Sequence, residues 1–99
     1  KSFPDESVDI AKFSYPGPLP FSKETAVLMM ADSVEAASRS LKQPTADAID
    51  RVVNDIIDHQ MDEGQFAQAD ITLKEINLVR KVLKKKLLNI YHLRIEYPD

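Results

Sequence analysis

Apolar residues recur at helical spacing along three stretches of the chain, and the middle stretch has the clearest pattern. A helix over residues 46–62 is predicted there, capped by Thr45 and ended by Gly64. Its apolar residues repeat at i, i+3, i+4, i+7, i+8 and i+12, the spacing of one buried face: Ile49, Val52, Val53, Ile56, Ile57 and Met61.

A second helix is predicted over residues 73–92. Thr72 and Glu75 form a T-x-x-E capping box, and Ile71 can staple onto Ile76. The apolar seam of this helix consists of Ile76, Val79, Leu83, Leu87 and Ile90. Three further apolar residues lie off the seam and need partners beyond a three-helix core: Leu78, Val82 and Leu88.

The first helix is predicted over residues 22–41, with Ser22 as its cap and Pro44 after its end. One stripe is apolar, comprising Val27, Met30, Ala31, Val34, Ala37 and Leu41. A second face is mostly small, comprising Met29, Ser33, Ala36 and Ser40. Little is left for solvent, so this helix is expected to be packed on most sides.

Asp32 places a carboxylate in the middle of that apolar run. It shares the remaining narrow stripe with Glu35 and Arg39, at i, i+3 and i+7. An ionic seam on a mostly buried helix is typical of a functional site.

Residues 1–21 contain four prolines, which favour an extended connector and leave room for a short helical turn only at residues 7–13. No stretch has the alternation of a strand. The sequence therefore predicts an all-α protein, with an extended Pro-rich arm over residues 1–21 and three main helices within residues 22–99.

Charge and composition narrow the function. The net charge is −3, and neither half of the chain is strongly basic, which argues against nucleic-acid binding. The run Lys84–Lys86, with Arg80 and Lys81, points in several directions and is interpreted as a solvated face, so lysine-mediated nucleic-acid binding ranks last. No apolar stretch approaches the ~20 residues of a membrane span. The chain begins at Lys1, so we expect a piece of a longer protein.

The chain lacks the parts of a complete active site. His59 and His92 are its only histidines, and neither has a partner at metal-ligand spacing. It has no cysteine and no glycine-rich phosphate loop. Its helical serines have no histidine base within sequence reach.

Several blocks together resemble a known family. They are Phe13-Ser14-Tyr15-Pro16-Gly17-Pro18, Met30-Ala31-Asp32-Ser33-Val34-Glu35-Ala36-Ala37 with Arg39, and Ile90-Tyr91-His92 followed by Arg94-Ile95-Glu96-Tyr97-Pro98. In order and spacing they resemble the C-terminal end of the seven-transmembrane receptors with an intracellular HD phosphohydrolase domain, the PgpH-type cyclic di-AMP phosphodiesterases. The resemblance covers nearly the whole chain.

The resemblance implies an all-helical domain that holds two divalent transition metal ions, Mn or Fe, and hydrolyses a phosphodiester with metal-activated water. Asp32 matches the last aspartate ligand of that site. The other ligands of the family would lie upstream, so this chain resembles half of an active site. We therefore expect the parent protein to be a hydrolase, and the chain alone to be inactive and to bind no metal.

Two further site residues follow from the resemblance. Arg39 is a candidate contact for a substrate phosphate or for the metal-site carboxylates; alternatively it forms an i,i+4 ion pair with Glu35 that stabilises the helix. For Glu35 the structural role is favoured. Tyr15 and the prolines up to Pro20 form either a wall of the substrate pocket or a rigid connector.

The partners implied are a cyclic dinucleotide, the upstream half of the HD domain, and the membrane part of a bacterial protein whose cytoplasmic domain this would be. A non-catalytic helical interaction module remains the alternative. In either case the vacated surface, with Met29, Ala36, Leu78 and Val82, predicts a two-fold homodimer or cover by the N-terminal arm with its aromatic residues, Phe3, Phe13, Tyr15 and Phe21.

Overall fold

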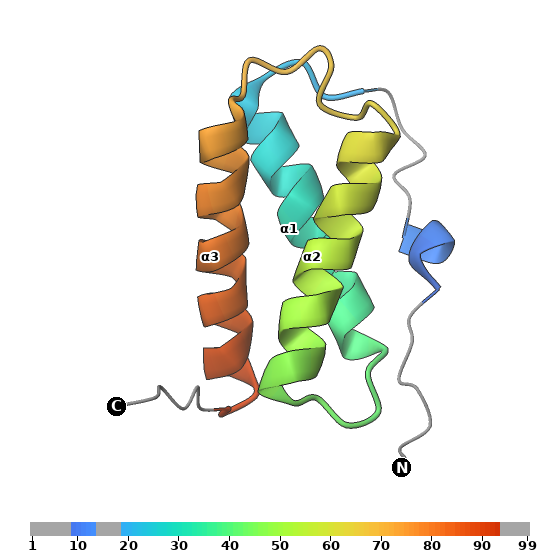
Figure 1. Cartoon of the computed structure of the whole chain (residues 1–99), viewed down its shortest axis with the longest axis vertical. Coiled ribbons are helices and arrows are strands. Elements are labelled where there is room, and N and C mark those ends of the chain that lie inside the picture. The colour runs from blue at the N-terminus through green and yellow to red at the C-terminus, as the bar shows by residue number, and fades with distance from the viewer. Residues whose placement is uncertain (1–8, 14–18, 94–99) are drawn as a thin grey trace.

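Helices account for all the regular structure of the described residues. The computed structural model describes residues 9–13 and 19–93, which contain the 3-10 helix η1 (Ile10–Phe13) and three α-helices, α1 (Lys23–Arg39), α2 (Ala46–Asp62) and α3 (Leu73–Ile90) (Figure 1). The predicted all-α class is confirmed. Within this part of the chain, no helix has both the length and the apolar content that a membrane crossing requires.

Helix α2 forms as its sequence pattern predicts. Thr45 caps it, with the side-chain hydroxyl accepting from the backbone N–H of Ala48 at 3.1 Å. Its face of isoleucine and valine residues is buried. After the helix, Gly64 has φ +71°, and the N–H groups of Gly64 and Gln65 donate back to Met61 and Gln60, each at 3.0 Å. This arrangement satisfies the last carbonyl groups of the helix.

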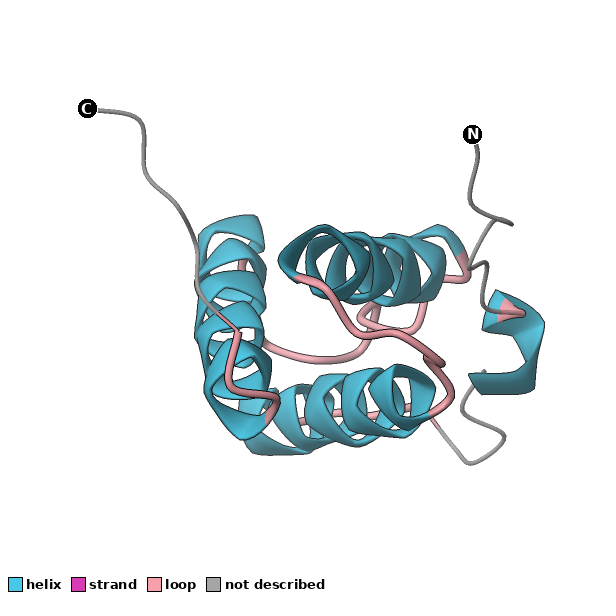
Figure 2. Ribbon diagram, turned by 90° about the horizontal axis from the view of Figure 1, so that it is seen from below, coloured by secondary structure: helices cyan, strands magenta, loops and turns pink. Residues whose placement is uncertain are grey.

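Helix α2 contacts each of the other elements, and the core lies around its buried face. Helices α1 and α2 lie against each other, α3 closes one side of the pair, and η1 lies on the opposite side (Figures 1 and 2). Ile10 and Phe13 of η1 pack against the core. Part of the predicted N-terminal arm is therefore a cover for the α1–α2 pair.

The starts of α1 and α3 are fixed by local hydrogen bonds. Ser22 caps α1, accepting from the N–H of Thr25 at 3.1 Å. Thr72 and Glu75 form the predicted capping box of α3. Both helices end two residues earlier than the sequence predicts, at Arg39 and Ile90.

Helix α3 ends in a reversal around His92. This residue has φ +58°, and the N–H of the next residue, Leu93, donates to the carbonyl of Leu88 at 2.8 Å. The reversal resembles the end of α2, with a histidine where glycine is most common. It folds Leu93 back onto the core.

Three burial predictions are wrong. Met29 is 2% exposed, so the second, mostly small face of α1 is not left to water at this position. Leu88 is buried and Ile90 is half exposed, because two residues along a helix point in nearly opposite directions and Leu88 is the one that faces the core. The predicted exposure of Leu78 and Val82 is confirmed.

Gln60 is a polar residue in the core. It is 2% exposed, and neither its side-chain oxygen nor its side-chain nitrogen has a hydrogen-bond partner among residues 9–13 and 19–93. Burying an amide without a partner costs free energy, because water satisfied it in the unfolded chain.

We expect the Gln60→Met substitution to stabilise the chain. Methionine has a similar length and removes the unpaired amide, so the free energy of unfolding should rise by about 1–3 kcal/mol. Urea unfolding followed by circular dichroism measures the change. The control Gln68→Met changes an exposed loop residue and should stay within about 0.5 kcal/mol. A clear loss of stability in Gln60→Met would contradict the assignment of an unsatisfied amide.

Candidate functional site

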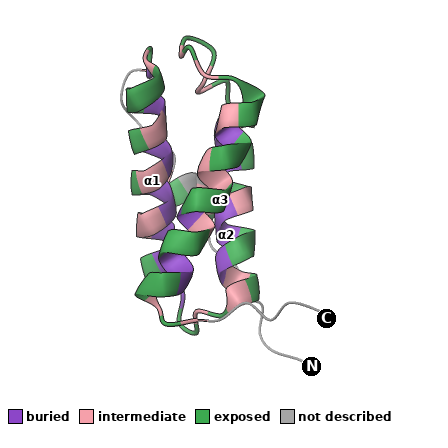
Figure 3. Ribbon diagram, turned by 90° about the vertical axis from the view of Figure 1, so that its left-hand side faces the viewer, coloured by how far each residue is buried: buried purple, intermediate pink, exposed green. Residues whose placement is uncertain are grey.

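Asp32 lies halfway along α1 on its outer face. The buried residues of this helix face α2 and the core, and they include Met30 and Val34 on either side of Asp32 in sequence. Since these two residues point inward, the carboxylate between them is turned outward and is exposed. Buried, intermediate and exposed positions alternate along the ribbon of α1 (Figure 3). The carboxylate therefore interrupts the apolar sequence without interrupting the core.

Helix α1 has a solvated strip, contrary to the prediction that it is packed on most sides. Leu28, Asp32 and Arg39 lie along this strip and are all exposed. Asp32 and Arg39 are two turns apart, or about 10 Å along the helix axis at 1.5 Å per residue. Neither side chain has an ion pair or hydrogen bond within residues 9–13 and 19–93. Both are therefore available to groups outside this part of the chain.

Glu35 is committed to a contact between helices. Its carboxylate binds the ammonium group of Lys86 on α3 at 2.8 Å, and its side chain is 29% exposed. The local pair of Glu35 with Arg39, one of the two sequence interpretations, does not form. Glu35 has the structural role that the sequence favoured, and its partner comes from α3.

The basic run of α3 is divided among its neighbours. Lys84 binds Asp50 of α2 at 2.7 Å, whereas Lys86 reaches the other way, to α1. Lys85 between them is exposed. The divergent directions match the interpretation of this run as a set of separate cations, which does not form a concentrated phosphate-binding face.

Arg80 connects α3 to α2 and is the least exposed of these cations. Its side chain is 14% exposed, and it binds Asp58 at 2.5 Å and the side-chain oxygen of Asn54 at 3.1 Å. The contact orients α3 on α2. It leaves Arg80 with a structural role in the described part of the chain.

The first turns of α1 and α3 are held together by Lys23 and Glu75. The ammonium group of Lys23 binds one carboxylate oxygen of Glu75 at 2.7 Å, and the other oxygen accepts the backbone N–H of Thr72 at 2.9 Å. The hydrogen bond from Lys23 and then that from Thr72 lower the pKa of Glu75. The hydrogen bond to Glu75 in turn raises the pKa of Lys23.

The last turn of α1 is tied to the end of α3 by two hydroxyl groups. The buried Ser38 hydroxyl donates to the carbonyl of Glu35 at 2.8 Å and lies 3.3 Å from the hydroxyl of Tyr91. Tyr91 is therefore the donor between the two hydroxyl groups. The sequence analysis missed this contact, because it depends on how closely two helices approach each other and leaves no pattern in the local spacing of residues.

The chemistry of a metal site is incomplete in the described residues. No group of three or more histidine, cysteine, aspartate and glutamate side chains is close enough to hold a metal ion there. Asp32 would be one ligand and would need others from outside residues 9–13 and 19–93. Tyr15, the other candidate substrate contact, lies outside the described residues.

The described residues form an all-α unit with one outward-facing candidate site residue, Asp32, and the comparisons with known proteins identify relatives of this unit. No family model matches the chain. It is 47% identical over 88 residues to the cyclic-di-AMP phosphodiesterase PgpH of Bacillus subtilis, and 45% identical over 89 residues to the PgpH of Listeria monocytogenes. It is also 33% identical over 91 residues to an uncharacterized protein of Synechocystis.

Solved structures agree with these sequence similarities. The HD domain of L. monocytogenes PgpH in complex with cyclic-di-AMP matches 84% of this chain with a TM-score of 0.76 and 44% identity. A second structure of that domain matches 79% with a TM-score of 0.75. The chain thus belongs, by sequence and fold, with the C-terminal part of PgpH-type HD domains, and the predicted resemblance is confirmed.

The chain is much shorter than these relatives. The two PgpH alignments include 89–90% of this chain but cover only 12% of either relative. The chain covers 39% of the crystallised HD domain. The larger part of such a domain has no counterpart here.

We expect the Lys23–Glu75 contact to make stability depend on pH at both ends of the range. Because the pKa of Glu75 is lowered on folding, its contribution is present above the ordinary glutamate pKa and is lost as the pH falls through and below about 4. Because the pKa of Lys23 is raised, its contribution is lost above about pH 10.

The measurement is the stability difference between the wild-type chain and Glu75→Gln in urea from pH 3 to 7. It should shrink at the acidic end, where Glu75 is protonated. The matched control is Glu24→Gln, an exposed carboxylate in the first turn of α1 whose difference should change less with pH. A pH-independent difference for Glu75→Gln would contradict the assigned contact.

Proposed function

We propose that this chain supplies part of the active site of a metal-dependent cyclic dinucleotide phosphodiesterase of the PgpH type. Asp32 is its metal ligand, Arg39 faces the substrate phosphate, and the remaining ligands come from a part of the HD domain outside the chain. The observation that carries the proposal is the outward, exposed carboxylate of Asp32, which has no partner within the described residues, in a chain that is 44–47% identical to PgpH relatives.

The position of Asp32 suits a ligand that completes a site assembled from two pieces. A carboxylate at the centre of a helix face is held at a fixed place by the packing of the helix beneath it. Lys23–Glu75 and Glu35–Lys86 fix the position of α1 against α3 on both sides of Asp32 along the chain. The side chain can therefore meet a partner surface with little loss of conformational freedom.

A pair of divalent metal ions, when bound in the complete domain, would supply Lewis acidity and neutralise charge on the phosphoryl oxygens. Among the described residues, Asp32 fits one ligand position, and no group of three or more candidate ligands is close enough to hold a metal ion. Asp32 offers a hard oxygen, which suits such a cation. We propose that the metal ions in the parent protein are Mn or Fe. We also propose that the chain belongs to the cytoplasmic domain of a bacterial membrane protein.

Arg39 has the chemistry to bind a phosphodiester. Its guanidinium group is exposed, lies on the same strip as Asp32, and has no carboxylate partner in the described part of the chain. A planar guanidinium presents paired N–H donors to a phosphate oxygen pair. Tyr15 stays a candidate for a neighbouring substrate contact.

In the complete HD domain, we expect Asp32→Ala to lower metal content and turnover together. Loss of a metal ligand should reduce activity by about 100-fold or more, because mutating a residue that only hydrogen-bonds to a ligand already costs roughly 10–100-fold. Metal analysis of the purified protein, together with cyclic di-AMP hydrolysis, measures both effects. Circular dichroism checks that the helices survive.

Two variants serve as controls. Glu24→Ala removes another exposed carboxylate of α1 and should leave metal content and turnover unchanged. Arg39→Ala should spare the metal and raise the KM for cyclic di-AMP. Normal metal content in Asp32→Ala would rule out the ligand role.

The isolated chain, in contrast, should be inactive. One aspartate cannot hold two metal ions in fixed geometry, so incubation with cyclic di-AMP and manganese or iron should give no hydrolysis. The readout is product formation by chromatography. Hydrolysis by the isolated chain that disappears in Asp32→Ala would show that the chain holds a complete site.

A second candidate function, a non-catalytic helical interaction module, is favoured by the exposed apolar side chains of α1 and α3. An interaction module does not explain why an exposed carboxylate, that of Asp32, occurs in a chain similar to a phosphodiesterase domain. The Asp32→Ala variant separates the two, because an interaction module would keep the same metal content.

A further inference from the structure

Glu35 binds a lysine from another helix, although an arginine lies one turn away on its own helix. Glu35 and Arg39 are four residues apart in α1, with the acid on the N-terminal side, and this spacing and order favour an ion pair on a helix surface. The Glu35 carboxylate instead lies 2.8 Å from the ammonium group of Lys86 on α3. Arg39 is left exposed, with no carboxylate partner in residues 9–13 and 19–93.

Glu35 lies beside the strip of α1 that carries Asp32 and Arg39. With 3.6 residues per turn, Asp32 and Arg39 differ by only about 20° around the helix, and Glu35 lies about 40° from Arg39, to one side of that strip. This side faces α3, because Glu35 is half-buried and its carboxylate reaches Lys86. The Glu35 side chain therefore has two cations within its range, one on α3 and one on the strip.

The turn of α1 that carries Glu35 is held against the end of α3 by other contacts as well. The Ser38 hydroxyl donates to the backbone carbonyl of Glu35 at 2.8 Å and lies 3.3 Å from the hydroxyl of Tyr91. Tyr91 directly follows α3, and Lys86 lies about one turn before the end of that helix. Because the two helices are already in place, the Lys86 contact selects the direction of one side chain and is not needed to dock the helices.

We propose that Lys86 is a positioning residue, which holds the Glu35 carboxylate on the α3 side and thereby keeps the Arg39 guanidinium free for a phosphate of the cyclic dinucleotide. This inference rests on the proposed function, in which Arg39 faces the substrate phosphate. A freed Glu35 would compete with the phosphate for the same N–H donors and would place an unpaired negative charge close to it. Lys86 thus affects substrate binding without contacting the substrate.

Two substitutions that break the same ion pair from opposite sides test the proposal in the complete HD domain. Lys86→Met releases the carboxylate and should raise the KM for cyclic di-AMP about two- to fivefold with little change in kcat, since a helix-surface pair alone is worth roughly twofold. Glu35→Gln also breaks the pair but removes the competing carboxylate, so its KM should not rise. The double variant Lys86→Met/Glu35→Gln should return the KM to the wild-type value.

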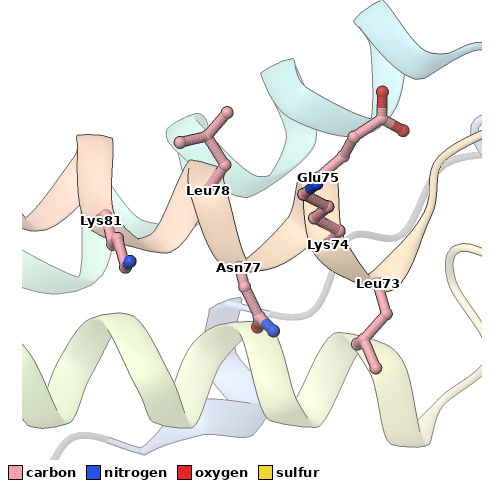
Figure 4. Close-up of a pocket in the computed structure, with 6 residues that line it drawn as sticks. All are labelled: Leu73, Lys74, Glu75, Asn77, Leu78 and Lys81. Carbon is pink, nitrogen blue, oxygen red and sulfur yellow. The ribbon is translucent and has the colours of Figure 1, made fainter.

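Two other lysines of α3 provide matched controls. Lys84→Met breaks a comparable ion pair, which Lys84 forms with Asp50 of α2 at 2.7 Å. Lys81→Met removes the same charge from α3, and Lys81 has no ion pair in the described part of the chain; it lines a shallow hollow with Asn77 and Leu78 (Figure 4). Neither control should change the KM, because neither releases Glu35.

A spectroscopic measurement on the 99-residue chain follows the side chains without any turnover. The Nε–H signal of Arg39 in a nitrogen-15 NMR spectrum should shift in Lys86→Met, because Arg39 then pairs with Glu35. The signal should return to its wild-type position in the double variant. An unchanged Arg39 signal in Lys86→Met would overturn the proposal whatever the kinetics show.

The kinetic outcomes separate this inference from the proposed function. A raised KM in Glu35→Gln, or no rescue in the double variant, would overturn the inference, because the ion pair would then act by holding the helices or Lys86 would bind the substrate itself. An unchanged KM in Lys86→Met with a raised KM in Arg39→Ala would overturn it and leave the proposed function standing. An unchanged KM in Arg39→Ala would overturn both, since Arg39 would then make no phosphate contact.

Discussion

The buried face of α2 is the constraint on which the rest of the structure depends. It is the surface onto which α1, α3 and η1 all pack, and its isoleucine and valine residues leave no room for water. Because α1 has to bury Met30 and Val34 against this core, the rotation of α1 about its own axis is set, and Asp32 is turned outward. The candidate site is thus a consequence of core packing, and the apolar character of the sequence around Asp32 is what holds its carboxylate in place.

Charged groups then set how α3 lies against this core. Glu75 does two things at once, because one oxygen caps its own helix and the other binds Lys23 of α1. Arg80 and Lys84 reach α2, and Lys86 reaches α1. Each exposed pair contributes little free energy by itself. Together they specify one arrangement of three helices whose apolar faces alone would tolerate others.

Two features are not accounted for by packing within the described residues. Leu28, Leu78 and Val82, large apolar side chains of α1 and α3, stay exposed. The buried amide of Gln60 has no hydrogen-bond partner among the described residues, which costs free energy inside the core. The first feature concerns the surface of the chain, and the second concerns its stability.

The sequence by itself determined the helices, because caps and apolar spacing act over a few residues: Ser22, Thr45 and Thr72 begin the three helices as predicted, and the face of α2 is buried as predicted. The sequence also pointed to Asp32 as a candidate site residue, and its motifs indicated the family of the chain. Tertiary structure decided the exposure of each position, since burial depends on which neighbour lies opposite. That is why Met29 is buried and why Leu88 replaces Ile90 in the core. It is also why Glu35 binds Lys86, about fifty residues further along the sequence, instead of Arg39 one turn away.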